Sequence, residues 1–195
     1  MRRFKVSLLV LALGLCVATP ASAQRTRSIV GISAGATTSD IEGGFLNTAS
    51  QWGFIGGIFG TARTSRNSIV GLEASYVQKG GEGLADLSYI DIPFIIGAVI
   101  PTANDALNFN FYTGIGIGIK VGCSETTGSS FGACDRAKGT EWTWPVGLAF
   151  AYRTANGKYF GLDGRYSAGI SDAFDGSGAR NRSWQFKALF GVPVG

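Results

Sequence analysis

Nine charged side chains share one face of the alternating apolar stretches that make up most of this chain. They are Glu73, Lys79, Asp91, Lys120, Glu141, Arg153, Asp163, Arg165 and Lys187. Four are acids and five are bases, so ion pairing can neutralise nearly all of them. An isolated buried charge is very costly. If this face is buried, we expect a salt-bridge network that fills the interior; a narrow ion path is the alternative.

The chain contains no histidine, which removes histidine-based general-base chemistry and most zinc sites. No spacing of serine, lysine or acidic residues indicates a nucleophile with its base. Gly114, Gly116 and Gly118 have the spacing of a phosphate loop, but the alternation continues through them and no helix is expected to follow. We therefore expect no enzyme activity, no cofactor and no metal site.

Residues 1–23 have the three parts of a secretory signal peptide. Basic residues at positions 2, 3 and 5 precede an apolar run, and Ala21-Ser22-Ala23 is a small-residue cleavage site. The apolar run is shorter than the ~18 residues of a transmembrane helix. We expect cleavage between Ala23 and Gln24 and one domain over residues 24–195. Three of the 17 basic residues lie in the leader, so the remainder nearly balances the 13 acids, and no nucleic-acid partner is expected.

Two cysteines remain after this cleavage, Cys123 and Cys134. In an exported chain, a pair of cysteines favours a disulfide over metal ligation. Both lie at the base of one predicted loop between adjacent antiparallel strands, which brings such positions close. We expect them to be bridged; two free or intermolecular thiols are the alternative.

Apolar and polar residues alternate over most of the mature chain, which predicts strands. Eight are expected, at Ser28–Thr38, Gln51–Ala62, Ser68–Lys79, Asp86–Ile100, Leu107–Val121, Glu141–Arg153, Tyr159–Ile170 and Ser183–Val194. Short turns follow the even-numbered strands, and longer Gly-rich loops follow the odd-numbered ones. This pattern places the long loops at one end of an up-and-down barrel, as in outer-membrane barrels.

One face of these strands is bulky, apolar and uncharged, whereas the other is rich in Gly, Ala and Ser. A soluble lipocalin-like barrel would bury the apolar face, and a membrane barrel would expose it to lipid. An eight-stranded barrel has an interior only wide enough for side chains, which suits small residues. The polar face also carries few charges for a surface in water. The sequence therefore favours an all-β fold, an eight-stranded antiparallel transmembrane β-barrel in the bacterial outer membrane.

All four tryptophans fall near the starts of even-numbered strands, at the predicted loop end. They are Trp52, Trp142, Trp144 and Trp184. An indole is favoured at a membrane interface, so we expect an aromatic girdle in contact with membrane lipids; in a soluble barrel they would fill the core. Basic residues at the same end are candidates for contacts with anionic lipopolysaccharide. They are Arg136, Lys138, Arg180 and Arg182.

Three stretches resemble the PorT-like outer-membrane β-barrel domain family. Residues 71–80 contain Glu73 followed by Tyr-Val-Gln-Lys-Gly, residues 87–94 contain Tyr-Ile-Asp-Ile-Pro with Asp91 where the family has glutamate, and residues 161–170 are similar to its penultimate strand. The resemblance covers most of residues 28–192 and implies an outer-membrane barrel, in a family mostly of unassigned role. Such barrels usually end in an aromatic residue read by the barrel assembly machinery. This chain ends in Gly195, so we expect Phe190 or another signal to serve assembly.

These observations predict a monomeric barrel with a filled lumen and a structural or surface-interactive role through its outer loops. Outer-membrane barrel enzymes generally employ a histidine, which this chain lacks. A small diffusion porin and an exported soluble lipocalin-like binding protein are the alternatives.

Overall fold

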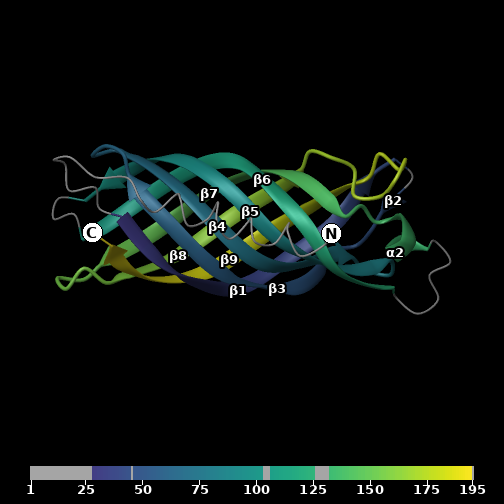
Figure 1. The fold of residues 1–195 in the computed structure, drawn as a ribbon, viewed down its shortest axis with the longest axis horizontal. Coiled ribbons are helices and arrows are strands. Elements are labelled where there is room, and N and C mark those ends of the chain that lie inside the picture. Colours follow the sequence, from purple (N-terminus) through teal and green to yellow (C-terminus); the bar gives the residue numbers. More distant parts are fainter. Residues whose placement is uncertain (1–27, 45, 103–105, 126–131, 195) are drawn as a thin grey trace, which may run out of the picture.

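The computed structural model describes residues 28–44, 46–102, 106–125 and 132–194, which close into a barrel of antiparallel strands (Figure 1). The predicted signal peptide and its cleavage site lie outside the described residues. The strands are β1 (Ser28–Gly43), β2 (Leu46–Asn47), β3 (Gln51–Arg63), β4 (Ser68–Gly81), β5 (Ala85–Pro101), β6 (Leu107–Glu125), β7 (Thr140–Arg153), β8 (Tyr159–Gly169) and β9 (Arg180–Val194). A single turn of helix, α2 (Ala133–Arg136), precedes β7. Within the described ranges, no helix has the length and apolar character to cross a bilayer.

Each long strand pairs with its neighbours in sequence, and β1 closes the barrel against β9. This closing ladder runs from the pair Ser28 and Val194 to the pair Glu42 and Arg180. The two-residue β2 only extends the turn after β1, so eight strands form the wall. Closure pairs the backbone all the way round, which lipid requires because it offers no hydrogen-bonding partner. The predicted eight-stranded antiparallel barrel is confirmed.

Several strands extend further at the loop end than the alternating pattern predicts. The first was expected to end at Thr38, but β1 continues to Gly43, and β6 continues past Val121 to Glu125. Neither β2 nor α2 was predicted. The extension of β1 is paired with β9 as far as Glu42, and its residues Ser39 and Ile41 are buried. Because Ser39 and Asp40 are both polar, the alternation that indicates a strand stops at Thr38 although the ladder continues.

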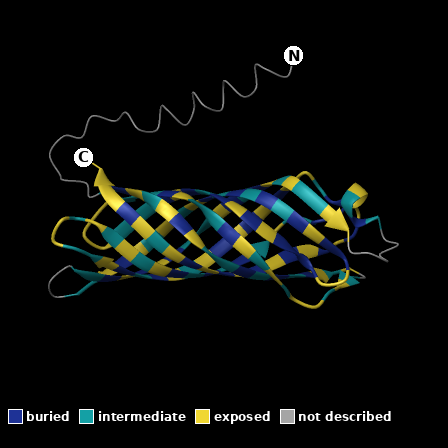
Figure 2. Ribbon diagram, turned by 90° about the horizontal axis from the view of Figure 1, so that it is seen from below, coloured by how far each residue is buried: buried dark blue, intermediate teal, exposed yellow. Residues whose placement is uncertain are grey.

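Burial alternates along the strands and gives the barrel wall a chequered appearance (Figure 2). Large apolar side chains such as Phe94, Leu148 and Leu162 point outward and are 48%, 54% and 65% exposed. The side chains of Tyr89 and Tyr112, from the polar face, are buried inside. An apolar outer surface around a polar interior is the reverse of a soluble barrel, so the lipocalin-like alternative is wrong.

Glycines on the inner face leave room for the interior side chains. A Cβ atom at Gly147 would lie 2.5 Å from the hydroxyl of Tyr112, and one at Gly118 would lie 2.7 Å from Oδ1 of Asp91. Real Cβ atoms do not approach other atoms so closely. The abundance of glycine on the polar face therefore follows from the narrowness of an eight-stranded barrel.

The outward apolar face predicts a depth-dependent response to charge. Phe94→Arg, in the middle of β5, should lower the free energy of unfolding in lipid vesicles by about 2–4 kcal/mol, because it places a guanidinium near the bilayer midplane. Val194→Arg, outward at the end of β9, is the matched control and should cost only about 0–1 kcal/mol. Urea titration of both variants followed by tryptophan fluorescence measures the difference. Equal effects at the two positions would contradict the assigned membrane depth.

Candidate functional site

The first interior cluster is centred on Glu73 of β4. Its carboxylate lies 2.7 Å from Nη2 of Arg165 on β8 and 2.6 Å from Nζ of Lys187 on β9. The hydroxyl of Ser75 also donates a hydrogen bond to it, at 2.6 Å. Because β4 is adjacent to neither β8 nor β9 in the sheet, these ion pairs reach across the barrel interior.

Tyr112 and Asp163 complete this cluster. The Tyr112 hydroxyl donates to Oδ2 of Asp163 at 2.5 Å and accepts a hydrogen bond from Nε of Arg165 at 3.0 Å. The other Asp163 oxygen lies 3.6 Å from Nζ of Lys187. Two acids and two bases meet here, so the cluster carries no net charge. We call these residues, with Glu73, the central cluster.

A second cluster lies nearer the loop end and is centred on Lys79 of β4. Its ammonium pairs with Oδ2 of Asp91 on β5 at 2.8 Å and with the carboxylate of Glu141 on β7. The Asn181 side-chain amide, from β9, donates to the other Glu141 oxygen at 2.6 Å. The Tyr89 ring centroid lies 5.2 Å from the ammonium. These residues form the upper cluster.

The structure therefore brings seven of the nine predicted interior charges into two clusters and places the other two elsewhere. Lys120 turns toward the loop end, where its ammonium donates to the backbone carbonyl of Cys134 at 3.4 Å and to that of Ala137. Arg153 is the last residue of β7, at the short-turn end, and its backbone N–H donates to the carbonyl of Ala106 at 2.7 Å. In the described part of the chain, no group of three or more histidine, cysteine or acidic side chains could hold a metal ion.

An apolar cap covers the inside of the loop end, and the sequence did not predict it. Its buried members are Ile41, Leu84, Ala85, Leu87, Tyr89, Ala133, Ala137, Ala173, Phe174 and Ala179. Phe174, from the loop before β9, is fully buried, and it forms a backbone bridge with Ala137. The only sequence signal was a phenylalanine within a polar, Gly-rich loop, which by itself does not say what the ring contacts.

The disulfide between Cys123 and Cys134 is present, with 5.6 Å between the two Cα atoms. It joins the end of β6 to α2, and the backbone N–H of Cys134 donates to the side chain of Glu125 at 2.9 Å. Lys120 holds the C-terminal end of the same short helix. The crosslink therefore fastens one side of the cap to the barrel wall.

The four tryptophans lie outside the barrel at the loop end, as predicted. Trp52 is 74% exposed. Thr38 of β1 is paired with Trp52 of β3 on one side and with Trp184 of β9 on the other. Trp144 donates its indole N–H to the hydroxyl of Thr113 at 2.8 Å. Arg182 and Arg180 lie on the same outward face of β9 as Trp184, closer to the loop end. Arg182 is paired with Glu42, and Arg180 is exposed.

Family comparison agrees with this geometry. The sequence profile of the outer membrane protein beta-barrel domain matches residues 8–190 of the chain. The chain belongs to this family. Its location is therefore the bacterial outer membrane, with the bulky face in lipid. No curated protein matches the sequence.

Two solved outer-membrane structures share the fold of this family member. Neisserial surface protein A superposes with a TM-score of 0.57 at 15% identity, covering 86% of this chain and 97% of that one. The outer membrane protein OprG from Pseudomonas aeruginosa superposes with a TM-score of 0.55 at 14% identity, covering 88% of this chain and 98% of that one. At such low identity the likeness establishes the barrel fold alone.

The central cluster predicts a large effect when one partner is removed. Glu73→Gln leaves Arg165 and Lys187 with only Asp163 as a counter-charge, and it should destabilise the barrel by about 3–5 kcal/mol. Glu42→Gln, which breaks the half-exposed pair with Arg182, is the control and should cost about 0–1 kcal/mol. Urea unfolding in vesicles measures both values. If the two variants lose equal stability, burial is not what makes the central pairs important.

The disulfide predicts a crosslinked peptide pair in protein taken from the outer membrane. Trypsin alone keeps both cysteines in one peptide, residues 121–136, so a glutamate-specific protease must also cut after Glu125. Without reductant, mass spectrometry should find the two halves joined through Cys123 and Cys134. Recovery of both cysteines alkylated without prior reduction would contradict the bridge.

Proposed function

We propose that this protein is a monomeric outer-membrane barrel with a filled lumen, which acts structurally and through its outer loops rather than as a channel or an enzyme. The observation that carries the proposal is the pair of interior clusters. Six strands of the wall contribute to them, and the charged residues are at most 7% exposed. Opening a path would require separating buried ion pairs, which costs several kcal/mol for each charge left unpaired.

The apolar cap supports the same proposal from the outer end. Phe174 and the alanines of the cap sit over the mouth, and the disulfide and Lys120 fasten this layer to β6. An ion would have to cross apolar side chains before reaching the upper cluster. The lumen is thus obstructed at two levels by different means, one apolar and one ionic.

The outer surface supports a role in contacts with the membrane surface. We infer that Trp184 lies at the interface and that Arg180, exposed above it on the outward face of β9, meets the phosphates of lipopolysaccharide. Arg182 is less available for this because Glu42 already binds it. Arg136 and Lys138, on and just after α2, would meet ligands above the membrane.

Within its family the chain best fits the PorT-like group, and this finer assignment is also a proposal. The residues that carry the resemblance have structural uses here. Glu73 is the centre of the central cluster, and Lys79 and Asp91 form the upper one. Because the residues of the PorT-like motif form ion pairs inside the barrel, the resemblance supports a structural role for it. Phe190, which is outward, 39% exposed and packed on Phe160, or another signal would then serve recognition by the barrel assembly machinery.

A filled lumen predicts that the protein is electrically silent. Purified, folded protein inserted into planar bilayers should show no steady nanosiemens-scale conductance, since an eight-stranded barrel leaves room only for its own side chains. The folded band on an unheated gel confirms that the inserted material is native. Phe94→Leu, which changes only the lipid face, should be equally silent. Reproducible large channels from the folded protein would overturn the proposal and favour the small diffusion porin.

A further inference from the structure

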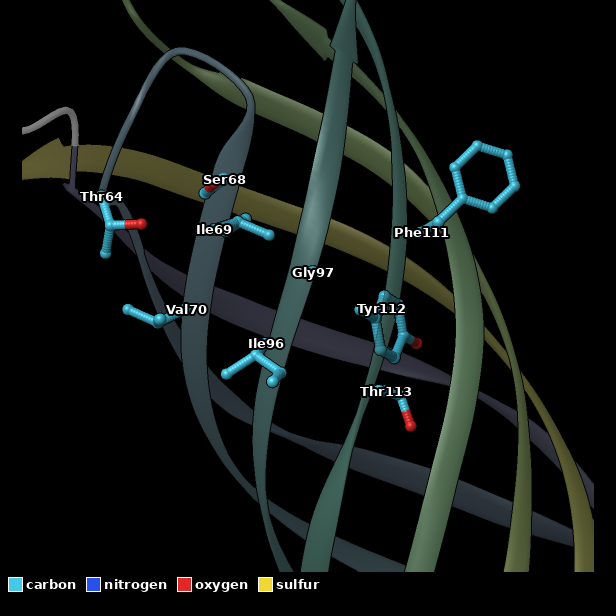
Figure 3. A pocket seen from close by; sticks show the side chains of 9 residues that line it. All are labelled: Thr64, Ser68, Ile69, Val70, Ile96, Gly97, Phe111, Tyr112 and Thr113. Carbon is cyan, nitrogen blue, oxygen red and sulfur yellow. The ribbon is translucent and has the colours of Figure 1, made fainter.

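The lipid-facing wall carries a groove near the short-turn end of β4, β5 and β6. Its volume is about 560 Å³, within the range of small-molecule sites. Figure 3 shows Gly97 of β5 at its centre, between Val70 and Ile96 on one side and Thr113 on the other. The pairing across these strands sets Val70, Ile96 and Thr113 in one row and Ser68, Ala98 and Phe111 in the next. Small residues alternate with large ones here, which hollows the apolar surface.

Polar groups lie at the lip of this groove, in the turn that joins β3 to β4. Thr64 and Ser68 both line it, and the backbone N–H of Thr64 donates to the carbonyl of Ser68 at 3.1 Å. Asn67 fixes the turn to β5, because its carbonyl accepts the N–H of Val99 at 2.8 Å and its side-chain amide donates back at 3.1 Å. The lip is therefore a fixed feature of the wall.

The turn that forms this lip also carries a cationic residue. Arg66 is exposed in the same turn, between Thr64 and Ser68 in sequence. The charged residues in the described part of the short-turn end are all basic: Arg63, Arg66, Arg153 and Lys158. Short turns face the periplasm in outer-membrane barrels, so this end meets the headgroups of the inner leaflet.

We propose that this groove is a binding site for an anionic phospholipid of the periplasmic leaflet. One acyl chain lies over Gly97 between Ile96 and Phe111, and the phosphate lies at the lip, within reach of Arg66 and the Thr64 and Ser68 hydroxyls. The position of the groove in the bilayer specifies an acyl chain, and the basic turn specifies a negative headgroup. A free anion would gain nothing from the apolar floor.

Native mass spectrometry of the whole folded protein tests this site. Protein in detergent receives either phosphatidylglycerol or phosphatidylethanolamine, and the retained lipid is counted. The wild type should retain phosphatidylglycerol in preference. Arg66→Gln should weaken that preference about fivefold, as expected for one basic side chain at an anionic surface. Ala98→Phe should fill the groove and reduce retention of both lipids.

Lys158→Gln, in the turn between β7 and β8 at the same end, is the matched control and should behave as the wild type. Unheated gels verify folding of each variant, and Arg66→Gln in an exposed turn keeps the test decisive if Ala98→Phe does not fold. Equal retention of the two lipids by the wild type would overturn the proposal. So would an equal loss in Lys158→Gln and Arg66→Gln, which would indicate general attraction to the basic end. Displacement of the lipid by inorganic phosphate would assign the site to a free anion and also overturn it.

Discussion

Every backbone N–H and C=O group within the membrane must find its hydrogen-bonding partner in the chain itself. Lipid offers no partner to an exposed N–H or C=O, so the sheet must close on itself. The ladder between β1 and β9 meets this requirement along nearly the whole of β1. Closure separates the two faces, because the alternation of side chains sends every second residue outward and the others into the lumen. The lipid outside and the narrow lumen inside then decide that the bulky apolar face is the outer one.

The number of strands then determines what the interior holds. Eight strands leave a lumen no wider than the side chains that project into it, so long charged residues on opposite walls must meet. Glu73 reaches Arg165 and Lys187 across this space, and Lys79 reaches Asp91 and Glu141. Buried charges are tolerable only when each has a counter-charge and hydrogen bonds. The glycines beside them are part of the same arrangement, since a larger residue at Gly118 or Gly147 would occupy the space of Asp91 or Tyr112.

The two ends of the barrel differ in packing and in charge. At the outer end a small apolar layer around Phe174 is buried, and it includes Ala133 of the helical turn that the disulfide ties to β6. At the periplasmic end the turns are short and their described charges are basic. The outer end therefore has its own packed core, whereas the periplasmic end has surface charge that favours anionic headgroups.

The period-two pattern and local spacing were enough to predict the strand number, the closed barrel, the orientation of both faces, the outward position of the tryptophans and the cysteine pair. The sequence also identified the charged residues of the inner face, but not their grouping. Which acid meets which base depends on the register and tilt of strands that are distant in sequence, so only the tertiary structure separated the two clusters and sent Lys120 to the carbonyls around α2. The cap around Phe174 and the groove over Gly97 were likewise decided by tertiary structure. Each is assembled from residues of several strands or loops whose local patterns carry no sign of one another.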